Sequence, residues 1–185
     1  YVGDLKPDSL AHLVVVRSPH AHARILKLDA CVAAKMPGVL CVLDATLWLV
    51  NGLPLETPVE VKVNFADGRP MNCFNRPVFA SDRVRYVGDT VAMVVAETLS
   101  QALDAAECIE VDYEELDAVV DVADACMASA PVLHECFTSN AAFYCEGGDS
   151  IATEEAFLAA AHVTELSLRC TRVTGNPIEP RTYLG

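Results

Sequence analysis

The chain has 185 residues, with 13 Lys and Arg against 26 Asp and Glu, and a formal net charge of −13. Hydrophobic residues make up 52% of it and its mean hydropathy is +0.29, which excludes an intrinsically disordered chain. Proteins that bind nucleic acids by neutralising phosphates need the opposite charge. The longest stretch without a charged residue, 45–55, is far shorter than the ~20 residues of a membrane-spanning helix.

The first half of the chain predicts three strands and one short helix. Residues 13–16 are apolar and mostly β-branched, and residues 25–28 alternate with polar neighbours, so both indicate strands that flank a turn at 18–22. Asp29 is expected to cap a helix over 30–36, and 39–43 predicts a buried strand. Residues 51–80, with four of the ten prolines, predict a long excursion with a short strand at 59–63, which makes this loop a candidate interface.

The second half predicts a strand-helix-strand unit and then a linker. Strands are expected at 83–86 and 90–96. Thr98 and Gln101 match a capping box, so a helix is expected to begin there, and 109–113 alternates as a strand with an acidic face. Four further segments follow in order: a short helix at 122–127, a linker at 128–150, a helix through 153–161 and a strand at 163–173.

The cysteines indicate the compartment. None of the eight stands in a CxxC pair, so no zinc or iron–sulfur motif is present in the sequence. Cys41 and Cys108 lie among apolar residues, which is typical of buried free thiols in a reducing compartment, and we therefore expect the protein in the cytoplasm. The chain starts without a basic n-region or an apolar h-region, which predicts no signal peptide.

Three groups of side chains are candidates for chemistry, and each has a structural alternative. His20 and His22 have the spacing of a metal-binding pair on a strand, but the preceding Ser-Pro favours a turn. The run of base, acid and thiol at 134–136 falls in the linker, and its neighbours in sequence point in different directions. A carboxylate pair for acid–base work would come from an acidic strand that is better explained as a solvated face: Asp112, Glu114 and Glu115.

The charge is uneven along the chain. Residues 86–168 hold 17 acids and no Lys or Arg, which indicates either a solvated acidic face or a docking face for a basic partner. No GxGxxG, Walker or GxSxG motif occurs. From composition and spacing alone, the chain is an acidic α+β domain with part of another.

Four stretches, in order, resemble the large molybdenum-binding subunit of the xanthine dehydrogenase, aldehyde oxidase and carbon monoxide dehydrogenase family. They are Arg17-Ser-Pro-His-Ala-His-Ala-Arg-Ile25, Met36-Pro-Gly-Val39, a long block from Arg76 through Thr98 to Leu116, and Asn176-Pro-Ile-Glu-Pro-Arg181. The resemblance implies an α+β fold with three parts: an α/β-hammerhead domain over 8–125, a linker over 126–144, and over 145–185 the truncated start of the molybdopterin-binding domain.

The resemblance also implies the chemistry of a larger enzyme. Its parent would be a molybdenum-dependent oxidoreductase that hydroxylates substrates with water-derived oxygen at a molybdenum-pterin cofactor. Electrons would leave through iron–sulfur clusters to FAD on other domains or subunits. The resemblance is also compatible with a homo-oligomer. The family's catalytic and cofactor-binding residues would lie beyond Gly185, so substrate choice among purines, aldehydes, N-heterocycles and carbon monoxide stays open.

For this chain itself the resemblance therefore assigns no catalytic, cofactor-binding or metal-binding residue, and we expect an inactive scaffold fragment. Glu179 is the one candidate for a position near the active site, with a structural role as the favoured alternative. The alternative from another class is a freestanding, non-catalytic interaction or assembly module with the hammerhead fold.

Overall fold

The structure is a computed structural model that describes residues 2–60, 63–171, 173–175, 178 and 183–184. The chain divides into two compact units, one over 8–144 and the other made of 1–7 and 145–185. In the described part of the chain, no helix is long and apolar enough to cross a membrane.

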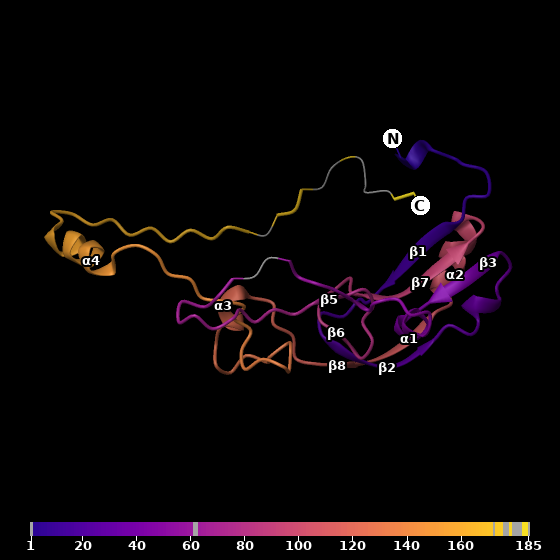
Figure 1. The fold of residues 1–185 in the computed structure, drawn as a ribbon, viewed down its shortest axis with the longest axis horizontal. Coiled ribbons are helices and arrows are strands. Elements are labelled where there is room, and N and C mark those ends of the chain that lie inside the picture. Colours follow the sequence, from indigo (N-terminus) through magenta and orange to yellow (C-terminus); the bar gives the residue numbers. More distant parts are fainter. Residues whose placement is uncertain (1, 61–62, 172, 176–177, 179–182, 185) are drawn as a thin grey trace. The chain divides into compact units, whose positions relative to one another are not determined.

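The first sheet of the larger unit has three antiparallel strands in the order β1-β7-β3 (Figure 1). Its strands are β1 (His12–Arg17), β7 (Thr90–Ala96) and β3 (Val39–Leu43). The helix α2 (Leu99–Glu107) packs on one face of this sheet. The side chains buried between them are small, which lets the helix approach the sheet closely: Ala33, Val94, Ala96, Ala102 and Ala105.

The helix α2 begins where the capping box predicts. Thr98 is its N-cap, and its Oγ accepts a hydrogen bond from the backbone N–H of Gln101 at 3.3 Å. The same hydroxyl donates to Oε1 of Gln101 at 2.8 Å.

The helix predicted at 30–36 is shorter than expected, because only a single 3₁₀ turn forms, η2 (Ala33–Lys35).

The second sheet places β2 (Ala23–Asp29) between β6 (Arg83–Val84) and β8 (Glu110–Glu115). Both neighbours run antiparallel to β2. Since side chains alternate along a strand, one face of this sheet is apolar and the other carries charged residues. The apolar face forms a second core with one residue of the segment between β5 and β6 and one residue of β7: Ala23, Ala80, Val84 and Val91.

Just before the predicted excursion at 51–80 lies a helix that the sequence pattern had not predicted, α1 (Ala45–Val50). Asp44 caps it, accepting a hydrogen bond from the backbone N–H of Leu47 at 2.7 Å. The strand predicted at 59–63 is wrong for its described residues, which are irregular, and 61–62 lie outside the described part. The strands of this region are instead β4 (Glu56–Thr57) and β5 (Arg76–Pro77), which pair with each other.

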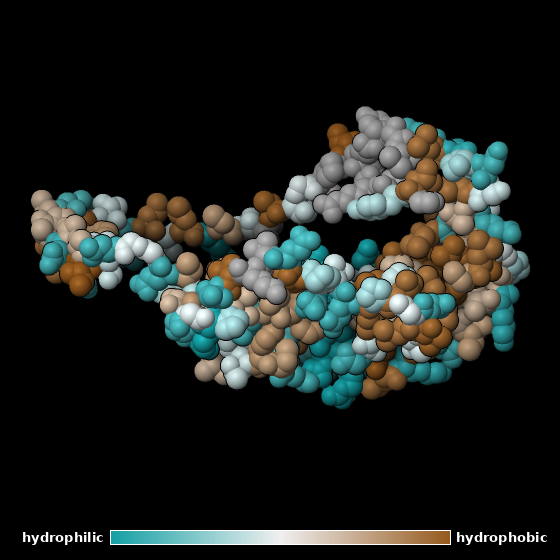
Figure 2. Space-filling view, viewed as in Figure 1, coloured by the Kyte–Doolittle hydropathy of each residue, from teal (hydrophilic) through white to brown (hydrophobic). Residues whose placement is uncertain are grey.

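Apolar side chains also gather on the surface over α1 (Figure 2). Leu49 is 52% exposed and Val50 is 77% exposed, whereas Trp48 turns inward, with its ring edge-on to the fully buried Phe79 at 5.5 Å. The helix thus has one face in the core and one apolar face in solvent.

The remaining elements are short. In the larger unit, 122–127 forms only α3 (Val122–Ala125). In the smaller unit, η1 covers Val2–Asp4, and α4 (Ser150–Ala159) begins earlier than predicted, with Asp149 as its N-cap. The strand predicted at 163–173 is wrong for the described residues, which form no ladder. A strand needs a neighbour to satisfy its backbone groups, and sequence alternation alone does not supply one.

Candidate functional site

The polar face of the second sheet is the most unusual environment in the larger unit. Ala23 pairs with Val84 across β2 and β6, and both side chains enter the apolar core. Alternation therefore places the neighbours of these two residues on the opposite face of the sheet: His22, Arg83 and Arg85.

The segment 131–142 covers this polar face and is tied to it by both arginines. Arg85 donates from Nε to the carbonyl of Leu133 at 3.0 Å, and Nη1 of Arg83 lies 2.8 Å from Oε1 of Glu135. Asn140 holds the segment in shape: its Oδ1 accepts from the N–H of Leu133 at 2.9 Å, and its Nδ2 donates to the carbonyl of Pro131 at 3.0 Å. The segment and the sheet thus enclose a layer of charged side chains, called here the polar layer.

An aromatic cavity of about 290 Å³ adjoins the polar layer. The ring of His134 lies 4.0 Å from that of Phe74 and 6.3 Å from that of Phe137. The Arg85 guanidinium lies over Phe74, 5.4 Å from its centroid. The other lining residues are Leu133 and five small or polar residues: Asn72, Ser139, Asn140, Ala141 and Ala142.

Three buried nitrogen atoms in this layer have no hydrogen-bond partner among the described residues: Nε2 of His22, Nε of Arg83 and Nδ1 of His134. His22 is only 6% exposed, and its Nδ1 lies 2.7 Å from the carbonyl of Asp117, which can only accept, so Nδ1 carries the proton. Burial lowers the pKa of His134 below its usual value, and the charges of Arg85 and His22 lower it further. Buried polar atoms without partners are rare, because each costs free energy.

The structure separates the two histidines that the sequence offered as a metal pair. Nδ1 of His20 lies 3.3 Å from Oε1 of Glu115, and its ring lies 4.7 Å from that of Tyr113. His22 belongs instead to the polar layer. The two imidazoles therefore have different partners and do not form a shared site.

The other sequence candidates also separate. Glu114 pairs with Arg24 and Glu115 with His20, so these two carboxylates do not form an acid–base pair. In the run at 134–136, His134 lines the cavity, Glu135 pairs with Arg83, and Cys136 is exposed. All eight cysteines are free thiols. Glu179 lies outside the described residues.

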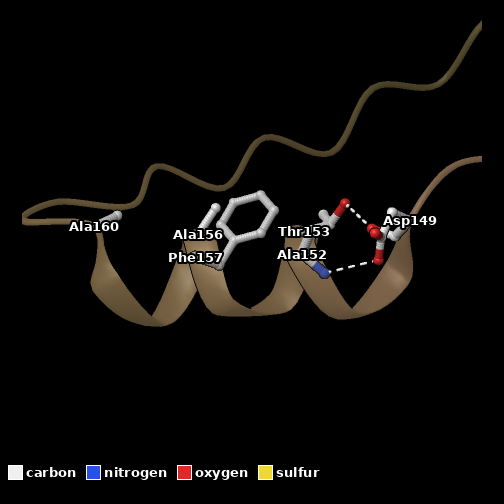
Figure 3. Close-up of a pocket in the computed structure, with 6 residues that line it drawn as sticks. All are labelled: Asp149, Ala152, Thr153, Ala156, Phe157 and Ala160. Atoms are coloured by element: carbon white, nitrogen blue, oxygen red, sulfur yellow. Dashed lines mark hydrogen bonds between the residues drawn. The ribbon is translucent and has the colours of Figure 1, made fainter.

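A second pocket, of about 490 Å³ and largely open to solvent, lies along one face of α4 in the smaller unit (Figure 3). Ala156, Phe157 and Ala160 line it, together with the capping turn, in which Asp149 accepts from the N–H of Ala152 at 2.9 Å and from the Thr153 hydroxyl at 2.7 Å. The polar groups of this pocket are thus the negatively charged carboxylate of Asp149 and the hydroxyl of Thr153, which already donates a hydrogen bond.

The described residues do not fit a molybdenum-pterin cofactor. The cavity along α4 would set the Asp149 carboxylate against the cofactor's phosphate. The aromatic cavity, at about 290 Å³, lies at the lower limit of sites for drug-sized ligands, and a pterin with its phosphate would overfill it.

Residues 1–117 match the family model of the aldehyde oxidase and xanthine dehydrogenase a/b hammerhead domain. The chain belongs to this family. Its larger unit therefore carries the hammerhead fold, and the polar layer described above lies within or directly beside the matched residues.

Relatives and solved structures agree with this assignment. The chain is 34% identical, over its whole length, to the gamma subunit of the 6-hydroxypseudooxynicotine dehydrogenase complex of Paenarthrobacter nicotinovorans, and 31% identical, over 97% of its length, to the carbon monoxide dehydrogenase large chain of Hydrogenophaga pseudoflava. It spans 22% of each of these relatives. The reconstituted CO dehydrogenase from Oligotropha carboxidovorans superposes with a TM-score of 0.70 at 32% identity, covering 88% of this chain and 20% of that one.

The sequence did not lead us to predict the polar layer of this hammerhead domain, although part of the residue pattern behind it is visible in the sequence. Polar residues at period two occur in both strands, as His22 with Arg24 and as Arg83 with Arg85. That spacing could have placed each pair on one face of a strand. Segment 131–142 covers this face through contacts such as that of Arg85 with Leu133, which is about fifty positions away in sequence. No local sequence pattern predicts such a contact.

Proposed function

We propose that this chain is the hammerhead scaffold of the large subunit of a molybdenum hydroxylase. The complete polypeptide would bind the molybdenum-pterin cofactor and hydroxylate its substrate with water-derived oxygen. Iron–sulfur and flavin domains or subunits would receive the electrons. The match of 1–117 to the hammerhead family carries this proposal. The alignment of at least 97% of the chain with the gamma subunit of a 6-hydroxypseudooxynicotine dehydrogenase complex and with a carbon monoxide dehydrogenase large chain supports it.

The side chains of the larger unit support a scaffold rather than a reaction centre. Its charged groups form local pairs, such as Arg24 with Glu114 and Lys27 with Asp29, and these pairs are largely solvated. Its apolar surface is wide: Leu13 is 52% exposed and Leu40 is 58% exposed. Exposed apolar groups of this kind are typical of surfaces that contact other protein.

The smaller unit supports the same proposal. Its helix α4 has ten residues and exposes Ile151, Phe157 and Leu158 by 60% or more. An isolated helix of that length is marginal in water, because nucleation is costly and few hydrogen bonds follow. We infer that α4 and the apolar residues at 163–184 belong to a second domain, with the boundary near the proposed linker at 126–144.

The decisive experiment isolates the natural polypeptide with an antibody against this segment and measures its intact mass and molybdenum content in one sample. A chain several times heavier than 19.9 kDa that carries molybdenum would support the proposal. A chain near that mass without metal would make it a freestanding interaction module. Stoichiometric molybdenum on the 185 residues alone would overturn the scaffold assignment.

A further inference from the structure

We propose that 131–142 is an acid-sensitive strap, which leaves the polar face of the second sheet when His134 takes up a proton. Release would expose Arg83 and Arg85, the two arginines that the strap covers, to solvent. Nothing in the oxidoreductase reaction requires such a device, so the inference goes beyond the proposed function.

The strap is held by a few polar contacts and not by a backbone ladder. Its residues form no helix or strand. The two arginines hold one end, at Leu133 and Glu135. At the other end, the backbone N–H of Asn72 donates to the carbonyl of Ala142 at 2.8 Å, and its Nδ2 donates to the carbonyl of Ala141 at 2.8 Å. A segment attached in this way can open while the rest of the domain stays folded.

His134 is the one histidine of the strap, and its ring faces the aromatic cavity. The ring lies 4.0 Å from that of Phe74, and its Nδ1 is buried without a hydrogen-bond partner among the described residues. An imidazolium needs an acceptor for each of its two N–H groups and loses its hydration when it is buried. The closed strap therefore favours the neutral ring.

The charged groups that act on His134 also oppose a proton. Burial lowers the pKa of His134 most, and the charges of Arg85 and His22 lower it further. The Arg85 guanidinium lies over the same Phe74 ring, 5.4 Å from its centroid. The segment 72–74, which carries this ring, contributes no charged side chain. A proton on His134 would thus add positive charge beside positive charge.

The carboxylates at the polar layer do not offset this repulsion. Glu135, whose side chain is 75% exposed, pairs with Arg83, and solvent weakens that pair. Asp89, which is 4% exposed, accepts from the backbone N–H of Arg85 at 3.1 Å. The pKa of His134 is lowered all the same, so neither carboxylate compensates for the positive charges.

Proton uptake therefore favours release. In the released strap the ring of His134 is in water with its ordinary pKa of 6.5, whereas in the closed strap its pKa is lower. Above pH 6.5 both states are neutral at this ring, and the strap keeps its full stability. As the pH falls below 6.5, the released state takes up the proton first, and the closed state loses stability until its own lower pKa is reached.

The test is hydrogen–deuterium exchange of the complete natural polypeptide near pH 7.5 and pH 5.5, read by mass spectrometry and corrected for the intrinsic pH dependence of exchange. In the closed strap, the N–H of Leu133 donates to Asn140 and that of Phe137 to the carbonyl of His134, both at 2.9 Å. We expect protection of the strap to fall about tenfold at the lower pH, because a free histidine one unit below its pKa favours the protonated form about tenfold. Protection of α2 should not change. Unchanged protection of the strap, or an equal loss in α2, would overturn the proposal.

Two variants and one control assign the effect to His134. His134→Phe keeps a ring against Phe74 and His134→Gln keeps a polar side chain, but neither replacement titrates. In each variant, protection of the strap should be the same at the two pH values. The control is His162→Phe, which removes an exposed histidine of the smaller unit and should keep the tenfold fall. A fall that persists in either variant, or that disappears in the control, would overturn the assignment.

A second measurement on the wild-type chain needs no substitution. The slow exchange of the imidazole C–H of His134, followed by mass spectrometry across the pH range, reports the pKa of this ring in the folded protein. We expect a value below the ordinary 6.5. A value at or above 6.5 would overturn the proposal, because protonation would then not release the strap.

Discussion

Gly38 should be far more sensitive to substitution than its position in a turn suggests. It adopts φ +78°, and its carbonyl accepts from the backbone N–H of Glu97 at 2.9 Å. A Cβ added there would overlap the side-chain amide of Gln101, the residue that completes the cap of α2. Gly38→Ala therefore imposes a left-handed backbone on alanine and also displaces the Gln101 side chain, which accepts a hydrogen bond from the cap residue Thr98.

Both costs can be estimated from the structure. The left-handed conformation costs roughly 1–2 kcal/mol for a residue with a Cβ. Moving Gln101 breaks its hydrogen bond with Thr98, which costs about 0.5–1.5 kcal/mol. Gly38→Ala should thus lower the free energy of unfolding by roughly 1.5–3.5 kcal/mol.

The matched control is Gly52→Ala, because Gly52 has a similar φ of +74° but no atom within 4 Å of the added Cβ. It should cost only the backbone term. Urea unfolding followed by circular dichroism gives both values. In a Gln101→Ala background, which has no side-chain amide to displace, Gly38→Ala should cost only the backbone term. Equal destabilisation by the two alanine substitutions would refute the role of Gln101.

Three further outcomes are expected. Thr98→Ala removes the N-cap of α2 and should cost about 1 kcal/mol, whereas Thr98→Ser should cost little; urea midpoints distinguish them. Phe79→Ala empties a fully buried site against Trp48 and should cost about 3–5 kcal/mol by the same assay; a loss below that of Thr98→Ala would contradict this packing. The Asp29 carboxylate has a pKa of about 2, lowered first by the backbone N–H of Cys31 and then by Lys27. Its contribution to stability is therefore present above the unfolded pKa of 3.8 and lost as the pH falls through 2. NMR titration of Lys27→Ala should find a pKa that is higher but still below 3.8; a return to 3.8 would show that Cys31 contributes nothing.

Local patterns in the sequence were enough to predict the helices and strands that are stabilised by residues close to one another in the sequence. The Thr98 and Gln101 pair fixed the start of α2, because a capping box satisfies backbone donors within four residues. The alternation at 109–113 predicted β8, and the residue blocks around 17–25 and 76–116 indicated the hammerhead family that the match over 1–117 establishes. A similar local signal, Asp44 before an apolar run and Gly52 after it, marks α1 and was overlooked.

Tertiary structure alone decided the features that depend on a distant partner. The residues at 163–173 alternate as a strand should, yet the described ones form no ladder, because strand hydrogen bonds need a neighbouring chain segment. The polar layer likewise exists only because 131–142 covers the charged face of β2 and β6. Sequence spacing placed Arg83 on a strand and His22 in the turn before one, but their burial without hydrogen-bond partners for Nε and Nε2 is a property of the assembled fold.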